Sequence, residues 1–355
     1  MNWILLIPAV MVAAGIRPRR EEDSLLPCLS SLCAIAALLM LGGQYVSVLG
    51  WPETGADIFR TVYEATAPYL PAVLLFTHGY MLRYRLPEIT RDDSVARKAE
   101  PLLSVYIRYL LCLALVLVLH LCLQDTLTMR MVIPALVGWP GVLMDEYRVF
   151  FMLIVSEAVL LFARQWTDAA RRSGFITPAR QTDAIAGALL IISTVMGGAL
   201  GATGSGTFWS GTALALPFGL VMARAEKTIA AQLKASAPAA AMLVLLLAYG
   251  LVRLLPSDTG IARCAVLFLG LTLITVLGCL FHWDQPLLRI LGRHAFTVLL
   301  TAQLFARVLE RETYFDKVSA CSLPVLVFGA ILLSVPVDGL TDLLLRRILP
   351  SEEDA

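Results

Sequence analysis

The chain has 355 residues, of which 58% are hydrophobic and only 15% are charged. Soluble globular chains carry about a quarter charged residues, so this composition excludes a soluble enzyme and a disordered chain. The formal net charge of +1 provides no basic surface for a polyanion, which excludes a nucleic-acid binder.

Long apolar runs recur from one end of the chain to the other, and the mean hydropathy is +0.77. A helix needs about 20 apolar residues to cross the hydrocarbon of a bilayer. The runs are continuously apolar rather than alternating, which favours helices over barrel strands. The sequence therefore predicts an all-α, polytopic membrane helix bundle with 10–11 transmembrane helices, at residues 2–16, 27–50, 67–82, 101–123, 147–163, 184–203, 207–223, 237–255, 260–282, 294–310 and 321–345.

Basic residues gather in every second loop between these runs. They follow the first, third, fifth, seventh, ninth and last runs, at residues 17–20, 83–98, 164–180, 224–234, 289–293 and 346–347. Cytoplasmic loops are enriched in Lys and Arg. The pattern therefore predicts an N-terminus outside the membrane and a C-terminus in the cytoplasm.

Three parts of the chain are expected. Residues 1–20 form a short extra N-terminal membrane segment, residues 21–347 the main transmembrane domain, and residues 348–355 a cytoplasmic tail. As a helix the first run is only about 24 Å long, so the sequence leaves open whether it spans the membrane. No basic residue precedes it, which disfavours a secretory signal peptide.

No metal site is predicted. The seven cysteines contain no CxxC pair and lie in or beside apolar runs, as small apolar side chains do. The sequence also has no HExxH, GxSxG or phosphate-binding Gly-Lys-Ser/Thr motif.

Ionisable side chains inside apolar runs are candidate functional groups, because hydrocarbon penalises them. His78 is a candidate general base or substrate ligand, or a histidine that is hydrogen-bonded between helices. Glu157 is the deepest acid and is expected either to be a neutral carboxyl or to pair with Arg108 or a histidine. Arg108 could clamp a phosphate or carboxylate, or extend to the membrane surface.

The remaining polar groups of the runs are expected to have lesser roles. Gln44 is expected to bond a neighbouring helix. His294 is expected at the membrane interface, and Asp338, two residues after Pro336, is expected to mark a helix break. The predicted bundle encloses a central cavity lined by Gln44, His78, Arg108 and Glu157.

Several short motifs, in order, resemble the acyltransferase-3 family of bacterial inner-membrane proteins. The resemblance spans about residues 20–347 and leaves the first run as an addition. The motifs are Leu75-Phe76-Thr77-His78-Gly79-Tyr80, Arg97-Lys98 with Tyr106, Leu216-Pro217-Phe218-Gly219 with Glu226-Lys227, Leu291-Gly292-Arg293-His294-Ala295-Phe296, and Ser334 with Asp338 and Arg346-Arg347.

The resemblance implies transfer of an acyl group, acetyl or succinyl, from a cytoplasmic acyl-CoA donor, usually acetyl-CoA. The implied acceptor is an envelope glycan or lipid-linked sugar, and the implied partners are the bilayer and polysaccharide biosynthesis proteins. The implied location is the bacterial inner membrane. Arg97 or Lys98 matches one of the paired arginines of the family's cytoplasmic linker, so both are expected to bind substrate, together with Arg108 and Gln44.

The chain departs from the family at its catalytic positions. The family's catalytic histidine falls on Gln44, and its arginine falls on Ala34 or Cys33. An amide cannot act as a general base. One explanation is relocation of the base to His78, oriented by Glu157. Another is an inactive scaffold for glycan export or assembly, and a third hypothesis is a secondary transporter.

Overall fold

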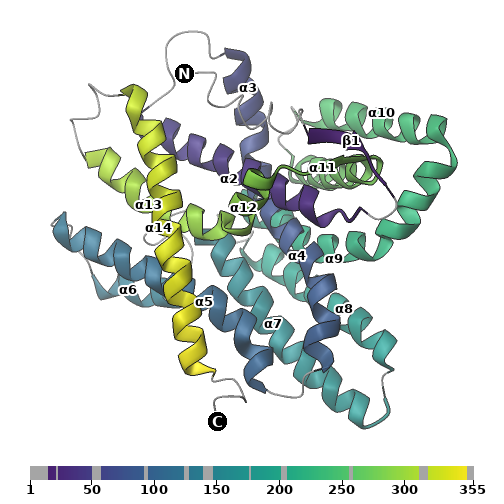
Figure 1. Cartoon of the computed structure of the whole chain (residues 1–355), viewed down its shortest axis with the longest axis horizontal. Coiled ribbons are helices and arrows are strands. Elements are labelled where there is room, and N and C mark those ends of the chain that lie inside the picture. The colour runs from purple at the N-terminus through teal and green to yellow at the C-terminus, as the bar shows by residue number, and fades with distance from the viewer. Residues whose placement is uncertain are drawn as a thin grey trace. The chain divides into compact units, whose positions relative to one another are not determined.

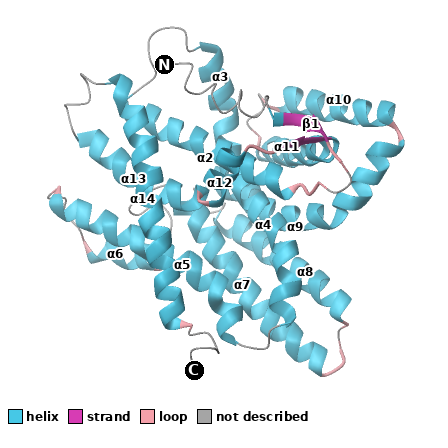
Figure 2. Cartoon of the chain, viewed as in Figure 1, coloured by secondary structure: helices cyan, strands magenta, loops and turns pink. Residues whose placement is uncertain are grey.

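The computed structural model describes residues 15–20, 23–49, 57–91, 95–123, 128–138, 147–175, 177–200, 206–255, 259–311 and 319–349. Nearly all of these residues are helical (Figure 2). The prediction of an all-α fold is therefore confirmed.

Each predicted apolar run after the first coincides with one helix. These helices are α2 (Leu26–Leu49), α4 (Leu70–Arg91), α5 (Val95–Cys122), α7 (Tyr147–Arg172), α8 (Pro178–Leu200), α9 (Gly206–Ala235), α10 (Ala237–Leu254), α11 (Gly260–Leu280), α13 (Ala295–Arg311) and α14 (Ser319–Ile348) (Figure 1). Residues 1–14 of the first run lie outside the described residues.

Six of the described helices are long and apolar enough to cross a membrane, namely α2, α5, α7, α10, α11 and α14. Shorter apolar stretches lie in α8, at Asp183–Val195, and in α13, at Ala295–Ala306. The chain is thus a multi-pass membrane protein, and the count of ten or eleven spans stays a prediction.

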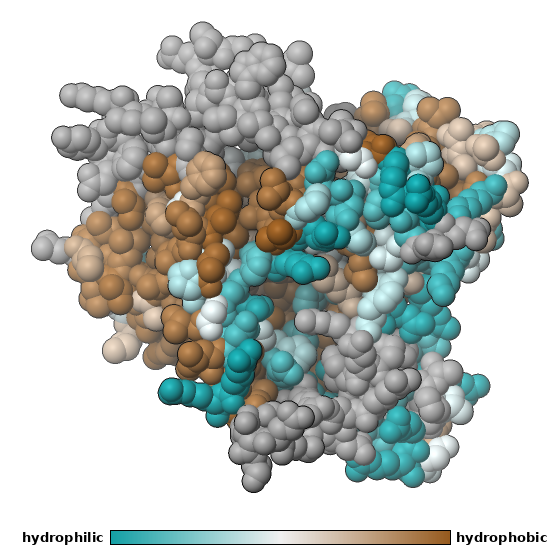
Figure 3. Space-filling view, in the orientation of Figure 1, coloured by the Kyte–Doolittle hydropathy of each residue, from teal (hydrophilic) through white to brown (hydrophobic). Residues whose placement is uncertain are grey.

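Apolar side chains cover much of the exposed surface, as they must where acyl chains are the solvent. On α10, Leu245, Leu246 and Val252 are 69%, 57% and 71% exposed. A second set lies on α6 (Met129–Leu136) and α14, where Met129, Phe328 and Leu332 are 74%, 64% and 71% exposed, and Figure 3 shows an apolar area over this part of the chain. Water would penalise apolar faces of this size, whereas lipid does not.

The chain divides into two compact units, each built from separate stretches of sequence. Unit 1 contains residues 1–39, 53–87 and 177–293, and unit 2 contains residues 40–52, 88–176 and 294–355. Each unit therefore has its own set of packed helices.

In unit 1, two glycines bring the backbones of α4 and α9 into direct contact. A methyl group at Gly79 would overlap the carbonyl of Leu216, and one at Gly219 would overlap the carbonyl of Phe76. Small residues allow this close approach, which is a common way for membrane helices to pack. The neighbouring Phe218 packs against Phe76, with ring centroids 6.0 Å apart. Two of the motifs that carry the family resemblance thus contact each other.

Unit 1 also contains a small sheet that the sequence did not predict. Strand β1 (Ile16–Pro18) pairs antiparallel with β2 (Phe281–Trp283), and Arg17 lies opposite His282. The expected run 260–282 therefore ends as a helix at Leu280. Further elements of this unit are α3 (Asp57–Thr66), a 3-10 turn (Ala67–Tyr69) and α12 (Pro286–Arg293).

Unit 2 is organised around the antiparallel hairpin of α13 and α14, and α5 contacts both helices. Helix α7 packs beside α5, and the short α6 follows α5 in the chain. The rings of Phe150 on α7 and Phe296 on α13 meet edge to face, 5.9 Å apart.

The glycine contact between α4 and α9 predicts the effect of a single methyl group. We expect Gly79→Ala to destabilise unit 1 by about 1–3 kcal/mol, because the added carbon overlaps backbone that cannot move aside easily. Gly187→Ala on α8 is the matched control, because a carbon added there meets nothing within 4 Å. Thermal unfolding in detergent measures both, and equal melting temperatures for the two variants would contradict the proposed contact.

Candidate functional site

A polar stripe runs along the face of α13 that meets α14. His294, Thr297 and Thr301 are spaced three and four residues apart, which places them on one side of a helix. Thr301 donates a hydrogen bond to the carbonyl of Ala330 over 2.8 Å. The other two side chains of the stripe both bond one carboxylate, that of Asp338 on α14.

Asp338 is the centre of this cluster. His294 Nδ1 lies 2.5 Å from Asp338 Oδ2, and Thr297 Oγ1 donates to Oδ1 over 2.8 Å. From α5, Arg108 Nε approaches Oδ1 to 2.8 Å. Three side chains from two helices thus converge on a carboxylate that is almost buried, with 12% of its side chain exposed.

This geometry assigns the tautomer of His294. The ion pair with Arg108 requires Asp338 to be a carboxylate, and a carboxylate only accepts hydrogen bonds. Nδ1 of His294 must therefore carry the hydrogen, which leaves a lone pair on Nε2 when the ring is neutral. The side chain of His294 is 43% exposed, so part of the ring is accessible. A histidine oriented by a carboxylate in this way is equipped to act as a general base.

Arg108 contributes charge as well as structure. Its Nε makes no hydrogen bond with aligned geometry among the described residues, so its contact with Asp338 is an ion pair. One third of the side chain is exposed. The guanidinium carries five N–H donors, and those that do not face Asp338 could receive an anionic group of a ligand.

Lys98 lies in a different environment from the one expected of a substrate ligand. Its ammonium group bonds Asp168 on α7 over 2.6 Å, and both side chains are buried. Removing one partner of a buried pair typically costs about 3–5 kcal/mol. The pair therefore joins α5 to α7, and its positive charge is already neutralised.

Unit 1 has a polar network of its own, which connects its N-terminal residues to α4 and α9. Glu226 on α9 accepts hydrogen bonds from Arg19, Tyr80 and Tyr84. Arg19 also donates to the carbonyls of Asp23 and Gly278.

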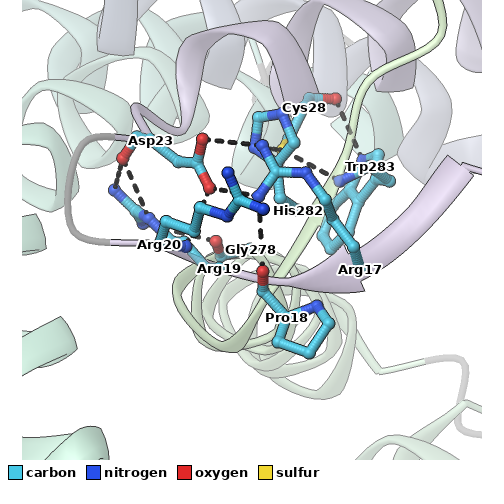
Figure 4. Close-up of polar contacts among 9 residues, drawn as sticks. All are labelled: Arg17, Pro18, Arg19, Arg20, Asp23, Cys28, Gly278, His282 and Trp283. Atoms are coloured by element: carbon cyan, nitrogen blue, oxygen red, sulfur yellow. Dashed lines mark hydrogen bonds and ion pairs between the residues drawn. The ribbon is translucent and has the colours of Figure 1, made fainter.

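Figure 4 shows the surroundings of the same N-terminal residues. Asp23 receives two hydrogen bonds from Arg17, which hold the pKa of this carboxyl far below its usual value. Trp283 donates its backbone and ring N–H groups to Cys28. These contacts connect the residues before α2, and Cys28 in its first turn, to β2 and α11. The polar network of unit 1 therefore holds the N-terminal residues against the rest of the unit.

The contacts of unit 1 also bear on the predicted alternation of loops. Arg19, Tyr84, Glu226 and Gly278 lie at the ends of the first, third, seventh and ninth apolar runs. The alternation of basic loops places these four ends on one side of the membrane. The structure brings these four ends together within unit 1, and the side of the membrane on which they lie stays a prediction.

The remaining predicted site residues are divided between the units. His78 lies half-buried on α4 in unit 1, and Glu157 is 2% exposed on α7 in unit 2. The side chains of Gln44 and Arg97 lie outside the described residues, although both positions are helical. The cavity expected between these groups and Arg108 stays a prediction.

His294 and Asp338 are the functional candidates that sequence reasoning assigned to lesser roles. The expected helix break is not observed, because α14 continues through Pro336 to Ile348. The available signals were the polar spacing along residues 294–301 and the two acids, Asp338 and Asp342, on the otherwise apolar run of the last helix. Neither signal shows that the side chains of His294 and Asp338, which are 44 residues apart in the chain, are in contact.

No family model matches the chain, and neither the curated proteins nor the solved structures provide a significant match. Among the described residues, no group of three or more His, Cys, Asp or Glu side chains could hold a metal ion.

The network of unit 1 predicts a dependence of stability on pH. Burial alone raises the pKa of Glu226, which lies beyond run 207–223, but hydrogen bonds from Tyr80 and Arg19 outweigh burial and hold the pKa below its ordinary value. Its ionised form therefore stabilises the fold above about pH 4.5, and this stabilisation is lost as the pH falls further. We expect Glu226→Gln to lower the free energy of unfolding at pH 7 by about 1–3 kcal/mol.

Melting temperatures measured from about pH 7 to pH 3 test this prediction. The Gln variant should lose less stability on acidification than the parent protein. Glu64→Gln is the control, because the pair that Glu64 forms with Arg60 is exposed and such pairs contribute little. An acid response of the Glu226 variant identical to that of the parent protein would contradict the role assigned to this carboxylate.

Proposed function

We propose that the chain is a membrane O-acyltransferase in which His294 is the general base. The acyl donor is an acyl-CoA on the cytoplasmic side, and the acceptor is a hydroxyl of a glycan or lipid-linked sugar. The observation that carries the proposal is the His294–Asp338 pair, with Nδ1 held by the carboxylate and the ring accessible. The donor and acceptor classes come from the family resemblance.

The proposed reaction is one acyl transfer. His294 Nε2 removes the proton from the acceptor hydroxyl while the oxygen attacks the thioester carbonyl carbon. The carbon–sulfur bond then breaks, and the leaving CoA thiolate takes the proton from Nε2. The products are an acyl ester of the acceptor and free CoA, and the histidine is neutral again.

Asp338 and its neighbours position the base. The carboxylate holds the Nδ1 tautomer and stabilises the imidazolium ring while it carries the proton, and Thr297 fixes the orientation of the carboxylate. Arg108 supplies positive charge for an anionic part of the donor. This assignment replaces His78 and Glu157, the pair first expected from the sequence, as the catalytic centre.

A second candidate function is proton-coupled transport. It is favoured by the Arg108–Asp338 ion pair on two apolar helices, beside a histidine. Charged chains of this kind mark proton relays in membrane proteins. The sequence has Pro217 and Pro336 inside apolar runs but no two matching halves with paired broken helices, the feature typical of transporters, so we rank transport second.

The catalytic proposal predicts the effect of two variants on acyl transfer by the purified protein. His294→Gln removes the base and should lower kcat by about 10²–10⁴-fold, the usual contribution of general acid–base catalysis. Asp338→Asn should lower kcat at least about tenfold with little change in the KM for acyl-CoA, because it affects orientation rather than donor binding. Release of CoA and labelling of the acceptor measure the reaction.

His78→Gln is the matched control, because His78 is the base first expected from the sequence and the present proposal gives it no part in the reaction. It should leave kcat within about twofold of the parent value. Loss of activity in the His78 variant but not in the His294 variant would move the base back to His78. A scaffold would be indicated if the protein had no activity with any acyl-CoA and a deletion strain had an altered envelope glycan. Transport would be indicated by proton uptake that depends on His294.

A further inference from the structure

Helix α6 carries an apolar face that the described part of unit 2 leaves uncovered. Three exposed side chains lie on the helix itself: Met129 is 74%, Ile133 60% and Leu136 44% exposed. Val137, the next residue, is 64% exposed. The exposed charged residue of this helix is Arg130, in its first turn. The sequence placed α6 within an aqueous loop, at residues 124–146, where such a face would be unfavourable.

The end of α6 lies beside the middle of a membrane-spanning helix. The candidate span of α5 runs from Lys98 to Cys122. Tyr109 contacts the end of α6. Along the helix it lies about 16 Å from Lys98 and about 20 Å from Cys122. Figure 1 shows α6 running back alongside the C-terminal half of α5. The chain thus leaves α5 at one surface and returns to about half its depth.

The last carbonyl groups of α6 accept hydrogen bonds from side chains of α5, as a helix that ends in hydrocarbon requires. The last carbonyls of a helix have no partner within it, and lipid offers them none. Tyr106 donates its hydroxyl to the carbonyl of Leu136 over 2.9 Å, and Tyr109 donates to the carbonyl of Ala135. The two rings stack against each other, 6.5 Å apart. The backbone N–H of Gly138 also donates to the carbonyl of Ala135, over 2.9 Å. The carbonyls therefore find donors in α5 and in the turn after α6.

The residue at which the chain leaves α6 lies against other helices of unit 2. Gly138 has a φ of +79°, a conformation that favours glycine. A carbon added to it would lie 3.2 Å from the side chain of Ile154 on α7. Phe150, one turn earlier on α7, meets Phe296 of α13. Gly138, in the turn after α6, thus packs against α7 of unit 2.

We infer that α6 is a re-entrant membrane helix whose exposed face contacts lipid acyl chains. It enters from the surface where α5 ends, with Arg130 toward that surface, and stops near the middle of the bilayer, where the hydroxyls of Tyr106 and Tyr109 satisfy its last carbonyls. This inference does not depend on the catalytic role of His294.

Single cysteines along α6 test its depth. Thr128→Cys, Ile133→Cys and Val137→Cys are introduced one at a time, and native membranes are treated with a membrane-impermeant maleimide. We expect Thr128→Cys to react above the background of the native cysteines, and the other two to react only after the membranes are dissolved in SDS. Equal reaction at all three positions in intact membranes would overturn the inference, because it would place α6 in water.

A spin label at Ile133→Cys distinguishes lipid from a protein partner. Lipid contact predicts that oxygen, which concentrates in hydrocarbon, relaxes the label more strongly than a water-soluble nickel complex. If neither reagent reached the label, a protein surface would cover α6, and the inference would be wrong.

The tyrosine cap provides a further test. Tyr109→Phe removes one donor, so we expect the rate of maleimide reaction at Val137→Cys to rise about tenfold through more frequent opening of the helix end. The Tyr63→Phe change, on α3 of unit 1, is the control and should leave the rate unchanged. An unchanged rate in the Tyr109 variant would overturn the role of the cap.

Discussion

Asp338 is a carboxylate on an apolar helix, and hydrocarbon offers it neither a hydrogen bond nor a counter-charge. The protein must supply both, because an ionised group without them would be too costly to keep in the membrane. It does so from α13 and α5, through His294, Thr297 and Arg108. A requirement of solvation thereby determines which helices meet in unit 2 and how the imidazole ring is oriented.

The same requirement explains other contacts that connect distant parts of the chain. The ammonium group of Lys98 is neutralised by Asp168, and Glu226 is surrounded by three donors. Packing without polar groups follows a different rule, shown by the glycine contact between α4 and α9. Polar contacts select partners by charge, whereas glycines select them by allowing backbones to touch.

The helices could be predicted from the sequence because the length and apolarity of each run are local properties. Each of the ten runs after the first forms one helix, although α4, α7 and α9 continue to Arg91, Arg172 and Ala235, well beyond the expected ends at 82, 163 and 223. The pairing of β1 with β2 and the course of α6 depend on residues far away or on contacts with α5, so no window of sequence contains them.

The candidate site was harder to predict for a related reason. His78, Glu157 and Arg108 were identified one at a time from the cost of burying them, and only Arg108 belongs to the proposed centre. His294 begins its helix, so its own run gives no sign of burial. Its importance follows from a neighbour on another helix, and a single sequence does not contain that pairing.

The attachment of the N-terminal residues in unit 1 has a consequence for biosynthesis. Arg19 bonds the carbonyl of Gly278, which lies 259 positions later in the chain. A ribosome makes the chain from the N-terminus, so Arg17, Arg19 and Asp23 emerge long before β2 exists. Most of the helices are already synthesised when the sheet closes, and its pairing is among the last steps of assembly in unit 1.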